Sequence, residues 1–325
     1  MQVTVAKTAG FCFGVRRALE LTQKSAALSP TCTLGELIHN RQVVEELAGQ
    51  GVTVIERPED APAGAAVVIR SHGVGPQVYD TLRAQGSPVI DATCPFVKRI
   101  HQIAAEVPED GLLLLAGRRE HPEVQGILGY CRGPALVFSS AEEMQELLAF
   151  LPSDGNIPVI LAAQTTFSLR EWEKILFFAK KVCTNLKVFD TICRATIERQ
   201  SEAKQLAQSA DAMVVVGGLH SANTTALAAL CGSYCPTVQV ETADQLERHR
   251  EALRGARFIG ITAGASTPAC IIKEVQNSMS VLENNTEEMN FGELLDQYSK
   301  SIHNGEKVTA VVTGIKPTEI SVDAG

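Results

Sequence analysis

Short apolar runs alternate with segments of helical periodicity along most of the chain, and this alternation limits the fold more than any other feature. Five runs are typical of buried strands, each followed by a polar or glycine-bearing loop and a helix: residues 67–70, 112–116, 159–163, 212–217 and 257–262. Strands that alternate with helices in this way form α/β units with mostly parallel sheets. The sequence therefore predicts an α/β protein, with helices over residues 15–27, 97–106, 169–181, 198–209 and 269–279.

A faint internal repeat divides this pattern into three parts. Val89-Ile-Asp-Ala-Thr-Cys94 is similar to Val188-Phe-Asp-Thr-Ile-Cys193, and each is a strand that ends in Asp-x-x-Cys before a helix. Residues 3–12 have the same layout and end in Cys12, but they lack the aspartate. The repeat predicts three similar lobes, roughly 1–90, 91–187 and 188–282, each presenting one cysteine at the carboxyl end of a strand.

The last part of the chain differs in character from the rest. Residues 283–303 begin with Glu283-Asn-Asn-Thr-Glu-Glu and are predicted to form a polar, acidic linker. Residues 304–325 are predicted to form two β-strands around a turn. Because two strands are too few to fold alone, we expect the functional body within residues 1–282.

The composition is that of an ordinary globular protein, since 45% of the 325 residues are hydrophobic and 20% are charged. No apolar run is long enough to span a bilayer and no signal peptide is visible, so we expect a cytoplasmic protein without membrane contact. Nine cysteines in that compartment favour metal ligands and buried thiols over disulfides. A net charge of −8 argues against wrapping by nucleic acid but allows a local anion site.

Polar and reactive side chains concentrate where the predicted strands end. The carboxyl ends of parallel strands meet at one edge of a sheet, where ligands bind in proteins of this class. A single histidine in such a loop is as often structural as functional, so it is the number of polar residues that favours a shared pocket. These candidates are Cys12, His39, His72, Cys94, His121, Glu123, Gln164, Thr165, Cys193, Ser221, Asn223 and Ser266.

The three repeat cysteines, Cys12, Cys94 and Cys193, each stand just before a predicted helix, where the positive end of the dipole favours a thiolate. Three thiolates from three lobes can hold a cubane iron–sulfur cluster and leave one iron without a protein ligand, as a Lewis acid. Zinc is the alternative, although the chain has no CxxC pair typical of a zinc finger. We interpret the CxxxC pair of Cys231 and Cys235 as structural.

Two glycine turns indicate an anion site. Residues 214–223 and 259–268 both run from a strand through a glycine turn to a hydroxyl or amide residue and a helix. Free backbone N–H groups in such turns bind phosphate, and Ser221, Asn223 and Ser266 would add donors. Helix capping explains the two serines equally well, and both roles use the same geometry. Neither a Walker A motif nor GxGxxG is present, so no nucleoside triphosphate or dinucleotide is indicated.

Glu123, in the segment His121-Pro-Glu-Val, is the candidate proton donor. A carboxyl group in a dry pocket has a raised pKa and retains its proton near neutral pH. The alternative is that Glu123 is a first-turn helix residue that complements the dipole.

Together these segments resemble the 4-hydroxy-3-methylbut-2-enyl diphosphate reductase family, also called the IspH or LytB family. The matching segments occur in family order over residues 1 to about 282 and are highly specific in combination. They are Gly10-Phe-Cys-Phe-Gly-Val, Ile38-His-Asn, Ser71-His-Gly-Val, Asp91-Ala-Thr-Cys-Pro-Phe-Val, His121-Pro-Glu-Val, Gln164-Thr-Thr, Cys193, Ser221-Ala-Asn and Thr262-Ala-Gly-Ala-Ser-Thr-Pro.

The resemblance implies an oxidoreductase that acts in the last step of the methylerythritol phosphate pathway of isoprenoid synthesis. Such an enzyme removes the hydroxyl group of (E)-4-hydroxy-3-methylbut-2-enyl diphosphate and forms isopentenyl and dimethylallyl diphosphate. The resemblance also implies three α/β lobes around one [4Fe–4S] cluster held by Cys12, Cys94 and Cys193, with ferredoxin or flavodoxin as electron donor.

The resemblance further assigns the site residues. Glu123 would deliver protons, and Thr165 would orient the substrate hydroxyl. The diphosphate would be bound by His39, His72, His121, Ser221, Asn223 and Ser266.

The chain departs from the family pattern at a few positions. Ala222 stands where a second serine is expected, and Ile197 and Glu198 replace smaller polar residues of many members. Residues 304–325 resemble the start of an OB-fold RNA-binding repeat, to which some members are fused. Any RNA or ribosome contact would therefore run only through this incomplete repeat.

Two other functions fit part of the sequence. A hydro-lyase of the aconitase type also uses an open iron to remove a hydroxyl group, but it needs no external electrons. Turnover without a reductant would favour that class. An RNA-binding protein is suggested by the tail alone, and salt-sensitive RNA binding would favour it, against the acidic charge balance.

Overall fold

The computed structural model describes residues 1–38, 40–149, 157–183, 185–284, 311–316 and 319–323. The chain forms two compact units, Met1–Ser280 and Val281–Gly325. In the second unit, strands β13 (Val311–Lys316) and β14 (Glu319–Asp323) pair antiparallel. The sequence predicts two strands around a turn in this part of the chain. No helix in the described part of the chain is both long and apolar enough to cross a membrane.

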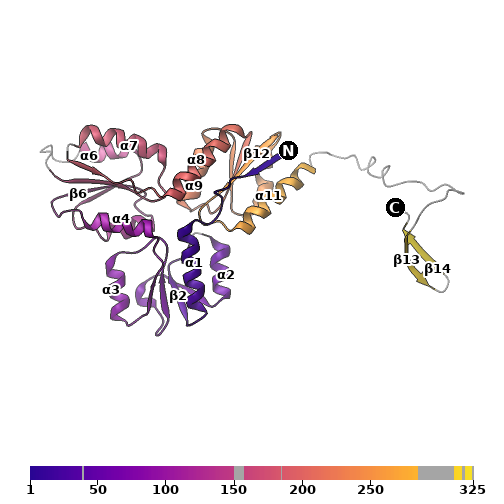
Figure 1. Ribbon diagram of the computed structural model, residues 1–325, viewed down its shortest axis with the longest axis horizontal. Helices are drawn as coiled ribbons and strands as arrows, with labels where there is room; N and C mark the ends of the chain where they lie inside the picture. The colour runs from indigo at the N-terminus through magenta and orange to yellow at the C-terminus, as the bar shows by residue number, and fades with distance from the viewer. Residues whose placement is uncertain (39, 150–156, 184, 285–310, 317–318, 324–325) are drawn as a thin grey trace. The chain divides into compact units, whose positions relative to one another are not determined.

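The first of three parallel sheets in the described part of the first unit has the strand order β3-β2-β4-β5. Figure 1 shows β2 of this sheet between its covering helices. Its strands are β2 (Thr31–Leu34), β3 (Val52–Ile55), β4 (Ala66–Ile69) and β5 (Val89–Asp91). Helices α1 (Phe13–Ala26) and α2 (Arg41–Gly49) cover one face, and α3 (Pro76–Ala84) covers the other. Because both faces are covered, every residue of β4 is buried, which explains its uninterrupted apolar sequence.

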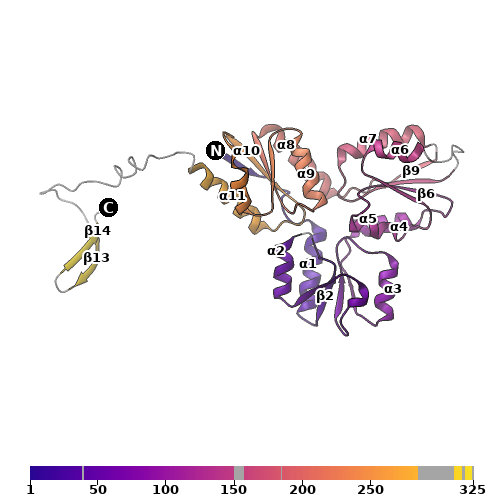
Figure 2. The same ribbon diagram turned by 180° about the vertical axis from the view of Figure 1, so that it is seen from behind.

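The second sheet repeats this order as β7-β6-β8-β9. Its strands are β6 (Leu112–Ala116), β7 (Ala135–Phe138), β8 (Val159–Ala163) and β9 (Leu186–Val188). Helices α6 (Ala141–Ala149) and α7 (Leu169–Val182) cover one face, and α4 (Pro95–Ala105) and α5 (Pro122–Leu128) cover the other (Figures 1 and 2). Alternate residues of β6 point to opposite faces: Leu114 packs with α6 and α7, whereas Leu113 and Leu115 pack with α4 and α5.

The third sheet has the order β1-β12-β10-β11. Its strands are β1 (Gln2–Val5), β10 (Ala212–Val216), β11 (Thr237–Val240) and β12 (Phe258–Ala263). Helices α8 (Arg194–Ser209) and α9 (Ala222–Gly232) cover one face, and α11 (Ala269–Asn284) covers the other (Figure 2). The short α10 (Arg250–Leu253) follows the 3-10 turn η2 (Ala243–His249), and a second such turn, η1 (Pro58–Asp60), lies in the first lobe.

The N-terminal strand belongs to the third sheet, not to the first. β1 pairs with β12 in parallel, with Val3 opposite Ile259. β1 therefore completes the last sheet, although the sequence predicts residues 1–90 as one lobe, and β5 and β9 end the first two sheets at Asp91 and Val188. Local sequence patterns specify a strand, but its partner is decided by contacts between distant segments, so the repeat alone could not place β1.

With β1 in this position, the three lobes have the same plan. Each cysteine follows the edge strand of its sheet, and its N–H donates to the carbonyl of the residue two positions beyond the neighbouring strand. The three hydrogen bonds run from Cys12 to Ala265 (3.1 Å), from Cys94 to Ser71 (3.0 Å) and from Cys193 to Thr165 (3.0 Å). The faint sequence repeat thus corresponds to a threefold structural repeat that brings the cysteine loops to the carboxyl ends of the strands.

The five predicted strands and five predicted helices are all present, with shifts at their ends. The largest shift at a helix start is in α8, which begins at Arg194 and not at residue 198. Its first turn lacks a strong apolar repeat because it faces the cavity described below, so the sequence pattern does not reveal it. The α/β class and the three lobes are confirmed.

Candidate functional site

A cavity of about 100 Å³ lies where loops of all three lobes meet. Ten of the predicted site residues line it: Cys12, His72, Cys94, His121, Glu123, Thr165, Cys193, Ser221, Asn223 and Ser266. Gln164 does not line the cavity; its side chain accepts a hydrogen bond from the Arg118 N–H at 3.3 Å and donates one to the Thr166 hydroxyl at 3.1 Å. His39 lies outside the described residues. Residues predicted from separate motifs thus converge on one site.

The three cysteines are the N-cap residues of α1, α4 and α8. None of the three side chains caps its own helix, so the sulfur atoms are available to a ligand. A Cβ atom at Gly14 would lie 2.8 Å from Cys94 Sγ and 3.9 Å from Cys12 Sγ. The sulfur of Cys94 therefore lies against the first turn of α1, in space that only a glycine leaves open.

Burial favours the protonated form of two of these thiols, Cys94 and Cys193. It raises the pKa of Cys94 to about 11, and negative charge on Cys12 and Cys193 raises this pKa as well. Burial also raises the pKa of Cys193, although its sulfur lies 3.2 Å from the Thr196 hydroxyl. The helix dipoles, which we expected to favour thiolates, are outweighed here. A compensating positive charge such as iron is needed to form thiolates in this cavity.

The donor set fits a polynuclear cluster better than a single ion. Among the described residues, no three His, Cys, Asp or Glu side chains are close enough to hold one metal ion. The cysteines instead approach the cavity from three separate lobes. Thiolate sulfur is the ligand type of iron–sulfur clusters, which occupy more space than one zinc ion.

Glu123, on the first turn of α5, is only 2% exposed. One carboxyl oxygen accepts a hydrogen bond from the Thr165 N–H at 2.6 Å, and the other accepts one from the Thr165 hydroxyl at 2.8 Å. Burial raises the pKa of Glu123 to about 7, and the two hydrogen bonds limit that rise. A carboxyl group with this pKa exchanges a proton readily at neutral pH.

His121 caps α5 and is oriented by it. Its Nδ1 accepts a hydrogen bond from the Glu123 N–H at 3.2 Å, which leaves Nε2 as the donor nitrogen. The rings of His72 and His121 meet edge to face, with centroids 5.4 Å apart. The two histidines therefore lie side by side in the cavity wall, where they can serve one anionic group.

The N-terminus of α9 contributes amide and hydroxyl groups. Ser221 accepts a hydrogen bond from the Thr224 N–H at 3.4 Å, so it caps the helix while it lines the cavity. Both Oδ1 and Nδ2 of Asn223 are buried without a hydrogen-bond partner among the described residues. Because buried polar groups are normally paired, this amide indicates a ligand. Ala222 also lines the cavity, so its methyl group occupies the place of the expected serine.

The other two departures from the family pattern lie away from the cavity. Ile197 packs against the apolar core of the second lobe. Glu198 is exposed and accepts a hydrogen bond from Arg194 Nε at 2.7 Å. Neither residue lines the cavity, so neither changes its edge.

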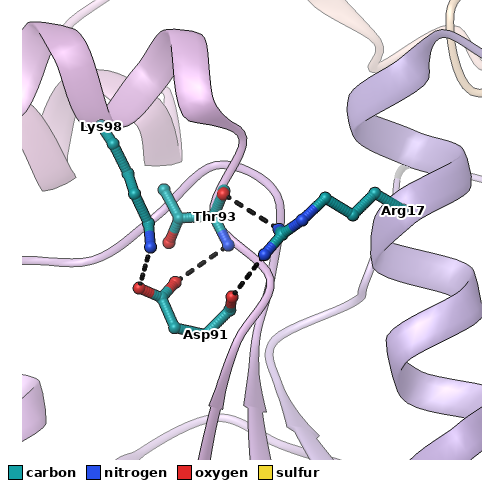
Figure 3. A network of polar contacts seen from close by, with 4 residues as sticks. All are labelled: Arg17, Asp91, Thr93 and Lys98. Atoms are coloured by element: carbon teal, nitrogen blue, oxygen red, sulfur yellow. Dashed lines mark hydrogen bonds and ion pairs between the residues drawn. The ribbon is translucent and has the colours of Figure 1, made fainter.

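A polar network holds the loop that carries Cys94 (Figure 3). The Asp91 carboxylate accepts a hydrogen bond from the Thr93 N–H at 3.0 Å and pairs with Lys98 Nζ at 2.6 Å. Arg17 of α1 donates to the carbonyl oxygens of Thr93 and Asp91, each at 3.3 Å. The helix capped by Cys12 thus supports the loop of the second cysteine.

Sequence reasoning missed Arg199, which is 3% exposed and lines the cavity. It lies on α8 in a largely polar segment, and a polar segment is normally a solvated helix face. No sequence pattern distinguished Arg199 from its neighbours, because its burial results from packing against a segment 190 residues away.

Three comparisons with known proteins agree with one another. A family model described as LytB protein matches residues 3–280. The 4-hydroxy-3-methylbut-2-enyl diphosphate reductase of Caldanaerobacter subterraneus subsp. tengcongensis is 40% identical over 297 residues, which are 88% of this chain and 99% of that protein.

Two solved structures are similar in fold. One is (E)-4-hydroxy-3-methyl-but-2-enyl diphosphate reductase, the terminal enzyme of the non-mevalonate pathway; it is 38% identical, has a TM-score of 0.61, and the match covers 86% of this chain and 100% of that chain. The other, E-1-hydroxy-2-methyl-but-2-enyl-4-diphosphate reductase from Plasmodium falciparum, is 26% identical with a TM-score of 0.78, over 86% of this chain and 87% of that chain. Since the family model and a relative 40% identical both span nearly all of the first unit, this chain belongs to the LytB protein family.

Proposed function

We propose that this chain catalyses the reductive removal of the hydroxyl group from (E)-4-hydroxy-3-methylbut-2-enyl diphosphate, the reaction for which its relatives are named. The carbon–oxygen bond to the hydroxyl group breaks, two electrons and two protons are consumed, and water leaves. The products are isopentenyl and dimethylallyl diphosphate. The observation that carries the proposal is the convergence of the three cysteines, Glu123 and the unpaired Asn223 amide on one cavity.

Cys12, Cys94 and Cys193 would hold one [4Fe–4S] cluster. Their sulfurs line one cavity, and their burial favours a metal-bound thiolate over a free one. When bound, the cluster supplies electrons one at a time and Lewis acidity.

The diphosphate would lie against His72, His121, Ser221, Asn223 and Ser266, with His39 as a further donor implied by the family resemblance. Its oxygens would accept a hydrogen bond from the Asn223 amide group, which has no partner among the described residues. The N-terminal end of α9 adds the favourable end of a helix dipole.

Glu123 would supply the proton that converts the leaving hydroxyl group into water. A pKa of about 7 lets it carry that proton at neutral pH. Thr165 donates hydrogen bonds to both carboxyl oxygens of Glu123 and so fixes the orientation of the acid. Its hydroxyl group would then orient the substrate hydroxyl group that receives the proton.

Ferredoxin or flavodoxin would deliver the electrons in the cytoplasm, where cysteines stay reduced; all nine are free thiols here. The antiparallel pair β13–β14 would be the start of an OB-fold repeat, and any RNA contact would run through it. Salt-sensitive RNA binding that is lost when the chain ends at Leu282 would support this assignment.

The proposal is tested by anaerobic iron and sulfide analysis together with turnover assays. We expect about four iron and four sulfide per chain, and product only when a one-electron reductant is present. Turnover without a reductant would point to a hydro-lyase. Protein that binds no iron–sulfur cluster after anaerobic reconstitution would overturn the proposal.

A further inference from the structure

Arg199 binds the segment that leads into Cys12. Its guanidinium Nε and Nη2 donate to the Thr8 carbonyl at 3.1 and 2.5 Å, and Nη2 also donates to the Gly10 carbonyl at 2.6 Å. These carbonyls lie between the end of β1 and Cys12. The planar, multidentate guanidinium therefore fixes the backbone two to four residues before the first cysteine.

Glu202 holds the same segment. Its carboxylate oxygens accept hydrogen bonds from the N–H groups of Lys7 and Thr8, each at 2.8 Å. Because residues three apart on a helix share a face, Arg199 and Glu202 act together from α8. Thr8 is bound at both its N–H and its carbonyl, by one residue each.

The helix that makes these contacts, α8, has Cys193 as its N-cap residue. A regular helix is rigid over two turns. The hydrogen bonds from its second and third turns to the backbone of Lys7–Gly10 therefore fix the position of Cys12 relative to Cys193. Figure 3 shows a comparable link, in which Arg17 of α1 donates to the loop of Cys94. Arginines thus join Cys193 to Cys12 and Cys12 to Cys94.

The two arginines differ in their charge balance. Arg17 is half-buried and lies near the half-buried pair of Asp91 and Lys98. Arg199 is buried, and no carboxylate among the described residues lies within ion-pair distance of it. Burial lowers the pKa of Arg199, whereas negative charge on Cys12, Cys193 and Glu202 raises it. A buried cation in this position needs negative charge nearby, which the Glu202 carboxylate and thiolates at Cys12 and Cys193 would provide.

We propose that Arg199 and Glu202 form a clamp that sets the position of Cys12 relative to Cys193, and that Arg199 also supplies the positive charge facing the thiolates. Arg199 is thereby a positioning residue for the metal centre. This inference rests on the proposed function in one respect, namely that Cys12 and Cys193 ligate the same cluster.

Four full-length variants separate the effect of the hydrogen bonds made by the clamp from the effect of the positive charge of Arg199. Arg199→Met removes both, Arg199→Lys keeps the charge but loses the planar fork, and Glu202→Gln weakens the second half of the clamp. Arg194→Met is the matched control, because Arg194 lies on the same helix, is exposed and, among the described residues, pairs with Glu198 alone. Each variant is reconstituted anaerobically, and cluster loss to a chelator and the reduction potential are measured.

We expect Arg199→Met to lose its cluster about 10–100-fold faster than the parent, as substitutions that support metal ligands typically do. Its reduction potential should fall, since a positive charge near the cluster is removed. Arg199→Lys should lose the cluster faster but keep the potential, and Arg194→Met should change neither. If a folded Arg199→Met variant matched the parent in both measurements, the proposal would be overturned.

A readout on the cluster-free chain separates this inference from the proposed function. Alkylation of Cys12 by iodoacetamide, scaled to that of the exposed Cys270, should be faster in Arg199→Met and in Glu202→Gln than in the parent. If the parent bound no cluster, the proposed function would be rejected. The alkylation rate of Cys12 would still decide whether the clamp exists. Should Arg199→Met not fold, an unchanged Cys12 rate in Glu202→Gln would reject the clamp.

Discussion

The two ends of helix α9 carry polar or thiol side chains that could bind a ligand, but their surroundings differ greatly. At its N-terminus, Ser221 and Asn223 open into the cavity, and the Asn223 amide has no partner among the described residues. At its other end, Cys231 is fully buried among apolar side chains, with its sulfur 4.0 Å from the Ala203 carbonyl. Burial raises the pKa of Cys231 to about 12.

The two ends of α9 differ in whether a helix terminus borders a cavity, and not in whether they carry residues that can bind a ligand. A helix N-terminus with unpaired polar groups beside a cavity can bind an anion or a metal centre. A cysteine closed into an apolar core at the far end of the same helix behaves as a small hydrophobic residue. The surroundings of Cys231 thus agree with the structural interpretation of the Cys231–Cys235 pair.

The largest effect should come from exchanging one cysteine of the cavity into which the N-terminus of α9 opens, Cys193, and one just beyond the buried end of α9, Cys235. Cys193→Ser should abolish the brown absorbance of the reconstituted cluster, because a serine hydroxyl is a poor substitute for a ligating thiolate. Cys235→Ser, at the far end of α9, should leave the absorbance unchanged. Loss of the cluster in Cys235→Ser, or its full retention in Cys193→Ser, would reverse the assignment of the two regions.

Glu123→Gln should keep the cluster and near-native substrate affinity but turn over at least ~100-fold more slowly, because the amide cannot donate the required proton. The measurement is anaerobic kinetics with a spectroscopic substrate titration. Glu120→Gln is the matched control, since Glu120 is exposed three residues away. A Glu123→Gln variant with most of its turnover would return Glu123 to the status of a first-turn helix residue.

The stability of the cluster-free chain should depend on pH through Glu123. Burial raises its pKa from 4.5 to about 7, so the folded chain holds a proton that the unfolded chain releases in this range. The free energy of unfolding therefore falls as pH rises from 4.5 to about 7, by about 3 kcal/mol in total from this group. Below this window the contribution is fully present.

Urea unfolding at pH 5 and pH 8 checks this dependence. Glu123→Gln should lose less stability than the parent between the two values. Cys231→Ala should lower the free energy of unfolding equally at both, because a thiol with a pKa of about 12 stays neutral throughout. Parallel pH profiles for Glu123→Gln and the parent would show that Glu123 is not protonated in the folded chain.

The smallest effect should come from Ala222→Ser. A hydroxyl group there adds one diphosphate contact that forms equally in the ground and transition states, so the KM should fall modestly while kcat stays nearly constant. Ala229→Ser, on the exposed face of the same helix near Cys231, has a similar cost in helix propensity and should change neither constant. A large fall in kcat for Ala222→Ser would mean that the position is packed and does not face the phosphate.

Much of this protein can be derived from its sequence because the relevant signals are local. The apolar run of Leu112–Ala116 specifies a buried strand, and the Asp-x-x-Cys segments place cysteines just before helices. The motif His121-Pro-Glu-Val places Glu123 on a first helical turn. Each of these statements depends on residues within one or two turns of each other, so the printed order of amino acids is sufficient.

Only the tertiary structure decided the properties that depend on distant partners. β1 completes the third sheet because it pairs with β12, at the other end of the first unit. The thiols of Cys94 and Cys193 have raised pKa values because burial outweighs the helix dipoles that the sequence predicts. Arg199 is buried because Thr8 and Gly10 bind it. Pairing, burial and desolvation arise between segments far apart in the chain, and local sequence patterns do not encode them.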